Sequence, residues 1–255
     1  MYTEQNNQKE AGIAGTKKRE SPWILPISII IAGLIIAVGL YYKGLQSESS
    51  QTQSKAGVFG AGSPENVKPI NAMDHILGNP AAPVKMIEFS DPECPFCKQF
   101  HETMKQVMRE YGQNGQVAWV YRQFPVDEIH SKARKEIQAI ECANEIGGNS
   151  KFWAYLNRIF EITPSNNNLD LSLLPKIALD VGIDVTKFEA CMVGDEKGGK
   201  YADHIESDYQ DGLASGAVGT PYTILISPNG KTYPVNGAMP FSSIKSIIDI
   251  ALQDK

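Results

Sequence analysis

The sequence is poor in cysteine and histidine and has no surplus of basic charge. Its 255 residues include four cysteines and four histidines, and 29 acidic residues outnumber 24 basic ones, giving a net charge of −5. A basic face or stripe is the electrostatic footprint of nucleic-acid binding, so this composition argues against a nucleic-acid partner. The histidines are scattered without metal-ligand spacing, and we expect no metal site among His75, His101, His130 and His204.

Long apolar runs are also absent, except for one near the N-terminus. Residues 23–42 (WILPISIIIAGLIIAVGLYY) contain no charged side chain. Twenty helical residues span about 30 Å, the hydrocarbon thickness of a bilayer, and Trp23, Tyr41 and Tyr42 stand where interfacial anchors are found. The run therefore predicts an uncleaved transmembrane helix. A cleaved signal peptide is the alternative, although its apolar core is usually about 7–15 residues and ends at a small-residue site.

The charges around this run predict its orientation. Residues 17–19 (KKR) precede it, whereas the residues that follow carry only isolated lysines. By the positive-inside rule, residues 1–22 form a cytoplasmic tail, and everything after the helix lies outside the cytoplasm, in the periplasm or the extracellular space. Residues 43–66 are rich in Ser, Gln and Gly, a composition typical of a flexible linker. A globular domain is then expected over residues 67–255.

Hydrophobic periodicity within this domain predicts strands and helices in a mixed order. Short apolar runs bounded by turn residues predict strands at 84–90, 117–125, 221–227 and, as an edge strand containing Pro234, 231–237. Helical spacing occurs at 95–112, through a block at about 128–213, and at 241–255. The initial strand–helix–strand unit predicts parallel strands with a right-handed crossover. The order fits a four-stranded mixed sheet with an inserted helical domain.

The motif CPFC at residues 94–97 has the spacing of a redox-active cysteine pair. A structural zinc site needs four ligands, usually in two paired clusters, and Cys142 and Cys191 stand alone elsewhere in the sequence. Cys94 comes where a strand gives way to a helix, with Pro95 at the first helical position, so its sulfur should face unpaired backbone N–H groups and the positive end of the helix dipole. Both favour the thiolate, the species that attacks disulfides.

The neighbours of Cys94 suggest further roles. We expect Cys97, one turn inward, to be the buried thiol that resolves a mixed disulfide. Phe96 cannot donate a hydrogen bond to the thiolate and should act through shape and desolvation. Glu88 lies in a strand expected to be buried, and is interpreted as a proton acceptor for Cys97. Glu93 is expected to be a surface charge, and His101 a solvent-facing helix residue that could otherwise tune the site.

These motifs resemble those of the DsbA-like thiol:disulfide oxidoreductases, in particular the membrane-anchored bacterial branch. The resemblance rests on FSDPECPFC, on the preceding HILGNPAAPVKMIEF and on SGAVGTPYTILIS, and it covers residues 73–255 in order. It implies a thioredoxin-like core with a helical insertion. It also implies a cis-proline beside the active site, Pro221 preceded by Thr220. The best-known member has His where Phe96 stands, so the strength of this protein as an oxidant does not follow from the resemblance.

Cys142 and Cys191 fall in the helical block, where members of this branch often carry a second disulfide. Outside the reducing cytoplasm we expect these two residues to form such a structural bridge, whereas two buried free thiols would be the default inside it. The sequence leads us to expect an extracytoplasmic oxidase that introduces disulfides into exported proteins without a bound cofactor. The resemblance implies reoxidation by a membrane oxidase of the DsbB or VKOR type.

Three alternatives remain open at this point. A reductase or isomerase would use the same residues in the reverse direction, because direction depends on the reduction potential and on the supplying partner. A soft-metal chaperone would use the CPFC pair to bind an ion such as copper(I). A catalytically silent binding module would use the helical block to hold a partner, and it would not need both cysteines.

Overall fold

A five-stranded mixed sheet forms the centre of the domain in the computed structural model, which describes residues 62–195 and 197–254. The strands are β1 (His75–Gly78), β2 (Val84–Ser90), β3 (Val117–Gln123), β4 (Tyr222–Ile226) and β5 (Thr232–Asn236), and their order across the sheet is β1-β3-β2-β4-β5. Strands β2 and β3 are parallel, and all other neighbours are antiparallel. The predicted strand–helix–strand unit and the edge position of β5 are therefore confirmed.

The sequence predicted four strands and missed β1. This strand has only four residues, begins at a histidine and ends at an exposed glycine, so it carries too little apolar alternation to be recognised locally. It forms because its backbone pairs with β3 in antiparallel register, His75 opposite Tyr121 and Gly78 opposite Ala118. The pairing covers what would otherwise be an open edge of β3, a strand buried along its whole length.

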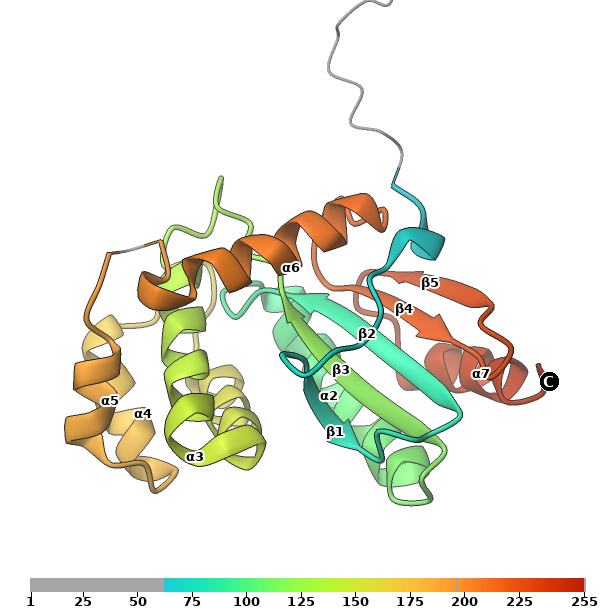
Figure 1. The fold of residues 1–255 in the computed structure, drawn as a ribbon, viewed down its shortest axis with the longest axis horizontal. Coiled ribbons are helices and arrows are strands. Elements are labelled where there is room, and N and C mark those ends of the chain that lie inside the picture. Colours follow the sequence, from blue (N-terminus) through green and yellow to red (C-terminus); the bar gives the residue numbers. More distant parts are fainter. Residues whose placement is uncertain (1–61, 196, 255) are drawn as a thin grey trace, which may run out of the picture. The chain divides into compact units, whose positions relative to one another are not determined.

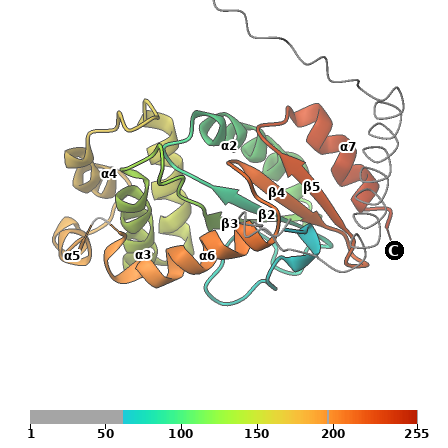
Figure 2. The same cartoon turned by 90° about the horizontal axis from the view of Figure 1, so that it is seen from above.

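Helices cover both faces of the sheet (Figures 1 and 2). Helices α2 (Pro95–Val107) and α7 (Phe241–Ala251) lie on one face, and α6 (Ala202–Ala214) crosses the other. The alternation of side chains along β2 explains this arrangement, because Val84 and Met86 join the core beneath α2 and α7 whereas Ile87 and Phe89 join the core beneath α6. Helix α2 continues into a short π-helical turn, Met108–Gly112, and the chain leaves the helix after Gly112, as predicted.

The inserted helical domain consists of α3 (Ala133–Ile162), α4 (Leu174–Asp180), α5 (Val185–Cys191) and most of α6, with short 3₁₀ turns at Leu171–Leu173 and Gly199–Tyr201. Helix α3 breaks at Gly148, whose φ of 71° is left-handed and therefore suits a residue without a Cβ. A disulfide joins Cys142 in α3 to Cys191 in α5, 49 residues later. It ties two helices of the insertion together, at a distance in sequence from the CPFC pair.

The N-terminal boundary of the domain lies before the predicted one. The turn Pro64–Asn66 falls in the linker predicted at 43–66, yet Ser63 N–H and the Asn66 side-chain amide both donate to the Ala214 carbonyl at the end of α6 (3.0 and 3.1 Å). The predicted tail (1–22), transmembrane helix (23–42) and linker up to residue 61 lie outside the described residues. Among the residues that are described, no helix is long and apolar enough to cross a membrane.

Candidate active site

Cys94 and Cys97 lie at the N-terminus of α2, the helix that follows β2 in the chain. Cys94 is the N-cap residue in extended conformation, and Pro95 occupies the first turn. Proline costs no hydrogen bond there, because the N–H groups of the first turn have no partner within the helix. Cys94 is 4% exposed and Cys97 is fully buried, whereas Phe96 between them is 60% exposed. Cys94 is therefore almost completely buried, Cys97 is completely buried, and the apolar ring of Phe96 between them is exposed to solvent.

The surroundings of Cys94 stabilise its thiolate. Hydrogen bonding from the Cys97 thiol, assisted by Thr220 and by the backbone N–H groups of Phe96 and Cys97, lowers the Cys94 pKa to about 6 against the opposing effect of burial. The two backbone donors are the unpaired N–H groups of the first helical turn. At neutral pH Cys94 is therefore largely ionised, which makes it a good nucleophile and a good leaving group.

Cys97 has the opposite environment. Complete burial, followed by the proximity of Cys94 and of the Glu88 carboxyl group, raises the pKa of the Cys97 thiol well above its usual value. The backbone N–H of Asp91 points at its sulfur, 3.5 Å away. Of the two thiols, Cys97 thus keeps its proton and donates it in a hydrogen bond, and Cys94 carries the charge.

Glu88 lies beneath the pair, inside the protein. Alternation along β2 places it on the α2 face, opposite Tyr121 and Thr223 in the neighbouring strands. The carboxyl group is fully buried; the Trp119 indole N–H donates to Oε2 (2.9 Å), and Oε1 has no hydrogen-bond partner in the described part of the chain. Burial raises the Glu88 pKa to about 7, so the group can hold or release a proton near neutral pH.

Thr220 and Pro221 come immediately before β4, and Thr220 lies next to the reactive sulfur. The peptide bond between them is cis, and the Thr220 carbonyl oxygen lies 3.5 Å from the Cys94 sulfur. The structure thus gathers every residue that the sequence singled out for thiol chemistry: Glu88, Cys94, Pro95, Phe96, Cys97, Thr220 and Pro221. They come from β2, from the N-terminus of α2 and from the residues just before β4, and β2 and β4 are neighbours in the sheet.

Two sequence-based expectations near this site are wrong. Glu93 is not a surface charge but is fully buried, and it accepts a hydrogen bond from the Asn167 N–H while its own carbonyl accepts one from Asn166 (2.8 Å). His101 is not solvent-facing but 1% exposed, with Nε2 2.6 Å from the Asn157 side-chain oxygen, and burial lowers its pKa to about 4. In both cases the helical insertion covers a position that would be exposed on the bare sheet and helix.

Sequence reasoning also missed a buried carboxylate beside the motif. The carboxylate of Asp91, the residue after β2, is buried, accepts from the N–H groups of Val126 (2.7 Å) and Glu93 (2.8 Å), and lies 2.9 Å from Nδ1 of His130. Hydrogen bonding to Asp91 raises the His130 pKa. The Asp-Pro sequence is a local signal of such a turn, because Asp side chains commonly bond to the backbone two residues on.

Among the described residues, one group of side chains away from the CPFC motif has the ligand types and spacing of a metal site. The ligand atoms of His75, Glu141 and His204 all lie within 4.8 Å of one another. The fold thus brings together His75 and His204, which are far apart in the sequence.

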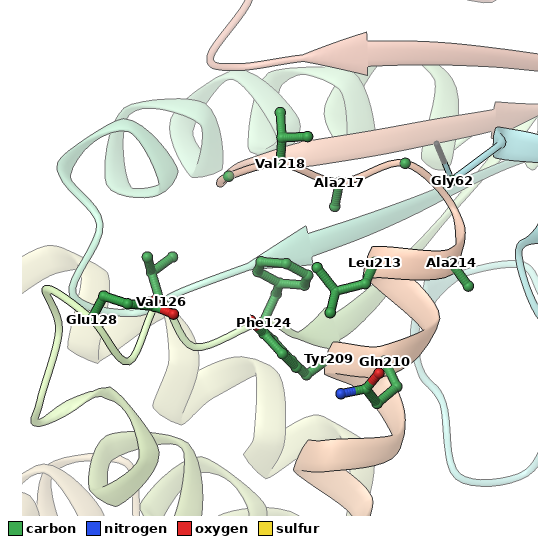
Figure 3. A pocket seen from close by; sticks show the side chains of 12 residues that line it. Gly62, Phe124, Val126, Glu128, Tyr209, Gln210, Leu213, Ala214, Ala217 and Val218 are labelled. Carbon is green, nitrogen blue, oxygen red and sulfur yellow. The ribbon is translucent and has the colours of Figure 1, made fainter. Parts of the chain in front are cut away.

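A hollow of about 740 Å³ lies between the end of α6 and the segment that follows it (Figure 3). Figure 3 shows Phe124, Tyr209 and Leu213 lining it from below and Ala217 and Val218 from above. The surface is mainly apolar, and Val218, two residues before Thr220, is 97% exposed. Exposed apolar side chains thus occur two residues after Cys94, at Phe96, and two residues before Thr220, at Val218.

Comparison with known proteins shows which fold the chain has. Wolbachia pipientis alpha-DsbA1 superimposes with a TM-score of 0.61 at 23% identity, covering 74% of this chain and 95% of that one. A Rickettsia prowazekii protein named as a protein-disulfide oxidoreductase is 24% identical over 194 residues, which are 73% of this chain and 64% of the relative. The chain therefore has the mixed α/β fold of the DsbA proteins, with the helical insertion that the sequence predicted.

Some curated relatives are much longer proteins. The Na⁺/H⁺ antiporter NhaA 1 of Mycolicibacterium gilvum is 29% identical over 116 residues, 46% of this chain, and the chain spans only 18% of that antiporter's length. A family described as thioredoxin matches residues 71–250, most of the chain and all five strands. This protein belongs to the thioredoxin family.

Proposed function

We propose that the protein is an extracytoplasmic thiol:disulfide oxidoreductase, anchored by residues 23–42, that introduces disulfides into exported proteins. The observation that carries the proposal is the asymmetry of the CPFC pair: Cys94 is 4% exposed and has a pKa of about 6, whereas Cys97 is completely buried and has a raised pKa. A stabilised Cys94 thiolate stabilises the reduced state of the pair, and this makes the oxidised state the stronger oxidant.

The reaction starts from the disulfide between Cys94 and Cys97. A client thiolate attacks the Cys94 sulfur, the bond to Cys97 breaks, and Cys97 leaves as a thiolate that takes up a proton. Glu88, with a pKa of about 7, is placed to supply that proton and to take it back on reoxidation. A second client thiolate then attacks the client sulfur of the mixed disulfide, and Cys94 leaves as its stable thiolate. The client gains a disulfide, and its two electrons reduce the CPFC pair.

Client binding is expected beside Cys94. The Thr220 carbonyl offers an acceptor 3.5 Å from the reactive sulfur, where the backbone of an extended peptide could donate to it. Two exposed apolar residues, Phe96 two positions after Cys94 and Val218 two positions before Thr220, suit the apolar side chains of an unfolded chain. The expected clients are exported polypeptides with free cysteine thiols, and reoxidation is assigned to a membrane oxidase of the DsbB or VKOR type.

The test mixes the oxidised full-length chain with reduced, unfolded ribonuclease A and follows both client thiols and recovered client activity. We expect stoichiometric transfer by the wild type and by the Cys142→Ser/Cys191→Ser control, which keeps the CPFC pair. We expect none by Cys94→Ser. Equal transfer by Cys94→Ser, or no transfer by the wild type, would remove the oxidase proposal.

The reduction potential of the CPFC pair separates the alternatives. A value well above that of thioredoxin, which is about −270 mV, supports an oxidase, whereas a value at or below it supports a reductase. A soft-metal chaperone would instead bind stoichiometric copper(I) when the pair is reduced and lose it when either active-site cysteine is replaced.

A further inference from the structure

Three polar side chains from distant segments converge away from the CPFC pair. His75 begins β1, Glu141 lies in α3 and His204 lies in α6. Nε2 of His75 is 3.1 and 3.0 Å from the two carboxylate oxygens of Glu141, and Nε2 of His204 is 3.9 Å from Oε1 of Glu141. His75 is 4% exposed and Glu141 3% exposed, so two of the three groups are nearly sealed from solvent.

Hydrogen bonding within the group leaves one ring nitrogen without a partner among the described residues. Nε2 of His204 is buried and has no hydrogen-bond partner among the described residues. Its nearest carboxylate oxygens, on Glu141 and Asp208, are 3.9 and 3.8 Å away, beyond hydrogen-bond range. Two ligands that each lie about 2 Å from a tetrahedral zinc ion are separated by roughly 3.3 Å, so a small movement of His204 would accommodate an ion.

Neighbouring side chains hold the three groups in position. The Gln123 amide donates to Oε1 of Glu141 (2.9 Å), and the His75 ring stacks on Phe152 with centroids 3.6 Å apart. Hydrogen bonds and packing of this kind orient the ligands at metal sites in proteins. Asp208, one turn after His204 on α6, adds a carboxylate oxygen 3.8 Å from Nε2 of His204.

The group is also reachable from outside. All three side chains line one hollow of about 410 Å³, together with polar residues that include Asn144, Asn149 and Tyr201. An ion can enter through this hollow, and a water molecule in it can complete a four-coordinate shell. The ligand charges also match a known kind of site. One carboxylate and two neutral imidazoles neutralise one of the two positive charges of a divalent ion, as they do in His₂Glu zinc sites.

We propose that His75, Glu141 and His204 bind a divalent transition-metal ion, zinc first among them. Two imidazole nitrogens favour zinc over calcium or magnesium, which prefer all-oxygen shells. The ion would join β1 of the sheet to α3 and α6 of the helical insertion, and so hold the two parts of the domain together. The proposal does not depend on the redox function.

The test uses the full-length chain with Cys94 and Cys97 oxidised, because a disulfide removes them as competing ligands. Zinc is titrated at pH 7 against a chromophoric chelator, and Co²⁺ replaces it for absorption spectroscopy. We expect one ion per chain, a tetrahedral Co²⁺ spectrum and a zinc-dependent rise in the midpoint of thermal unfolding (Tm). In His204→Gln, which loses no hydrogen bond, and in Glu141→Gln, affinity should fall about 100-fold or more.

Glu145→Gln is the matched control, since Glu145 lies one turn further along α3 and bonds instead to Lys200 and Tyr201. It should bind zinc like the wild type. Circular dichroism checks that each variant is folded. If Glu141→Gln does not fold, the zinc affinity of His204→Gln alone decides the test. No zinc binding by the wild type overturns the proposal, and so does binding that survives His204→Gln unchanged.

Discussion

Replacing Cys97 by alanine or by serine separates the local causes of the low Cys94 pKa. The hydrogen bond from the Cys97 side chain is the largest of these causes, ahead of Thr220 and the backbone donors of the first helical turn. Alanine removes the donor, whereas serine keeps an O–H at nearly the same place. Both variants leave Cys94 as a single free thiol, so that only one sulfur of the motif titrates.

The magnitude follows from the energy of a hydrogen bond to a charged group. Such a bond is worth about 1.5–3 kcal/mol, and one pKa unit corresponds to about 1.4 kcal/mol. Cys97→Ala should therefore raise the Cys94 pKa from about 6 to roughly 7–8, short of the value of about 9 of a free thiol because the backbone N–H groups and Thr220 remain. Cys97→Ser should stay near 6.

The assay follows thiolate absorbance near the ultraviolet edge, and independently the rate of iodoacetamide alkylation, between about pH 4 and 10, with pH midpoints fitted to a single ionisation. At pH 7 the wild type should be about 90% thiolate and the alanine variant about half or less. Midpoints for the alanine and serine variants that agree within about 0.3 pH unit would refute the role given to the Cys97 donor. A wild-type midpoint near 9 would refute the wider interpretation of the site.

Three further predictions concern residues around and beyond the redox pair. Glu88 has its pKa raised from 4.5 to about 7, so the folded state keeps a proton that the unfolded state loses, and this costs about 3 kcal/mol of stability as pH rises from 4.5 to 7. Urea unfolding at these two pH values should show that Glu88→Gln lacks this loss. Stopped-flow measurements should show that Glu88→Gln slows the attack of the client thiolate on Cys94, the step in which Cys97 leaves and takes up a proton. Cys142→Ser/Cys191→Ser should lower the free energy of unfolding by about 4 kcal/mol, because the disulfide closes a loop of 49 residues, while oxidation of clients by the folded protein is unchanged. Phe96→His should raise the reduction potential, measured against glutathione, by about 30 mV, since an added donor stabilises the Cys94 thiolate by about 1.4 kcal/mol at this exposed position; an unchanged potential would contradict this reasoning.

Local pattern was enough to predict the elements that create the redox pair. The apolar run of β2, the proline after Cys94 and the helical spacing that follows are all short-range features, and a helix N-terminus has the same unpaired N–H groups in any fold. The position of Glu88 also followed from local pattern, because the side chains of a strand alternate and the β2 face that carries Val84 and Met86 must be buried. These inferences needed no knowledge of what packs against what.

The remaining features depend on contacts between residues far apart in sequence. Strand β1 is defined by its pairing with β3, and the burial of Glu93 and His101 depends on the insertion lying over them. His75 and Glu141 are 66 residues apart and meet only because β1 joins the sheet edge beside α3. The sequence by itself thus determined the chemistry at the start of α2, which is set within one helical turn. Only the tertiary structure decided which distant polar groups are buried together, because burial and convergence arise from long-range packing and leave no periodic trace along the chain.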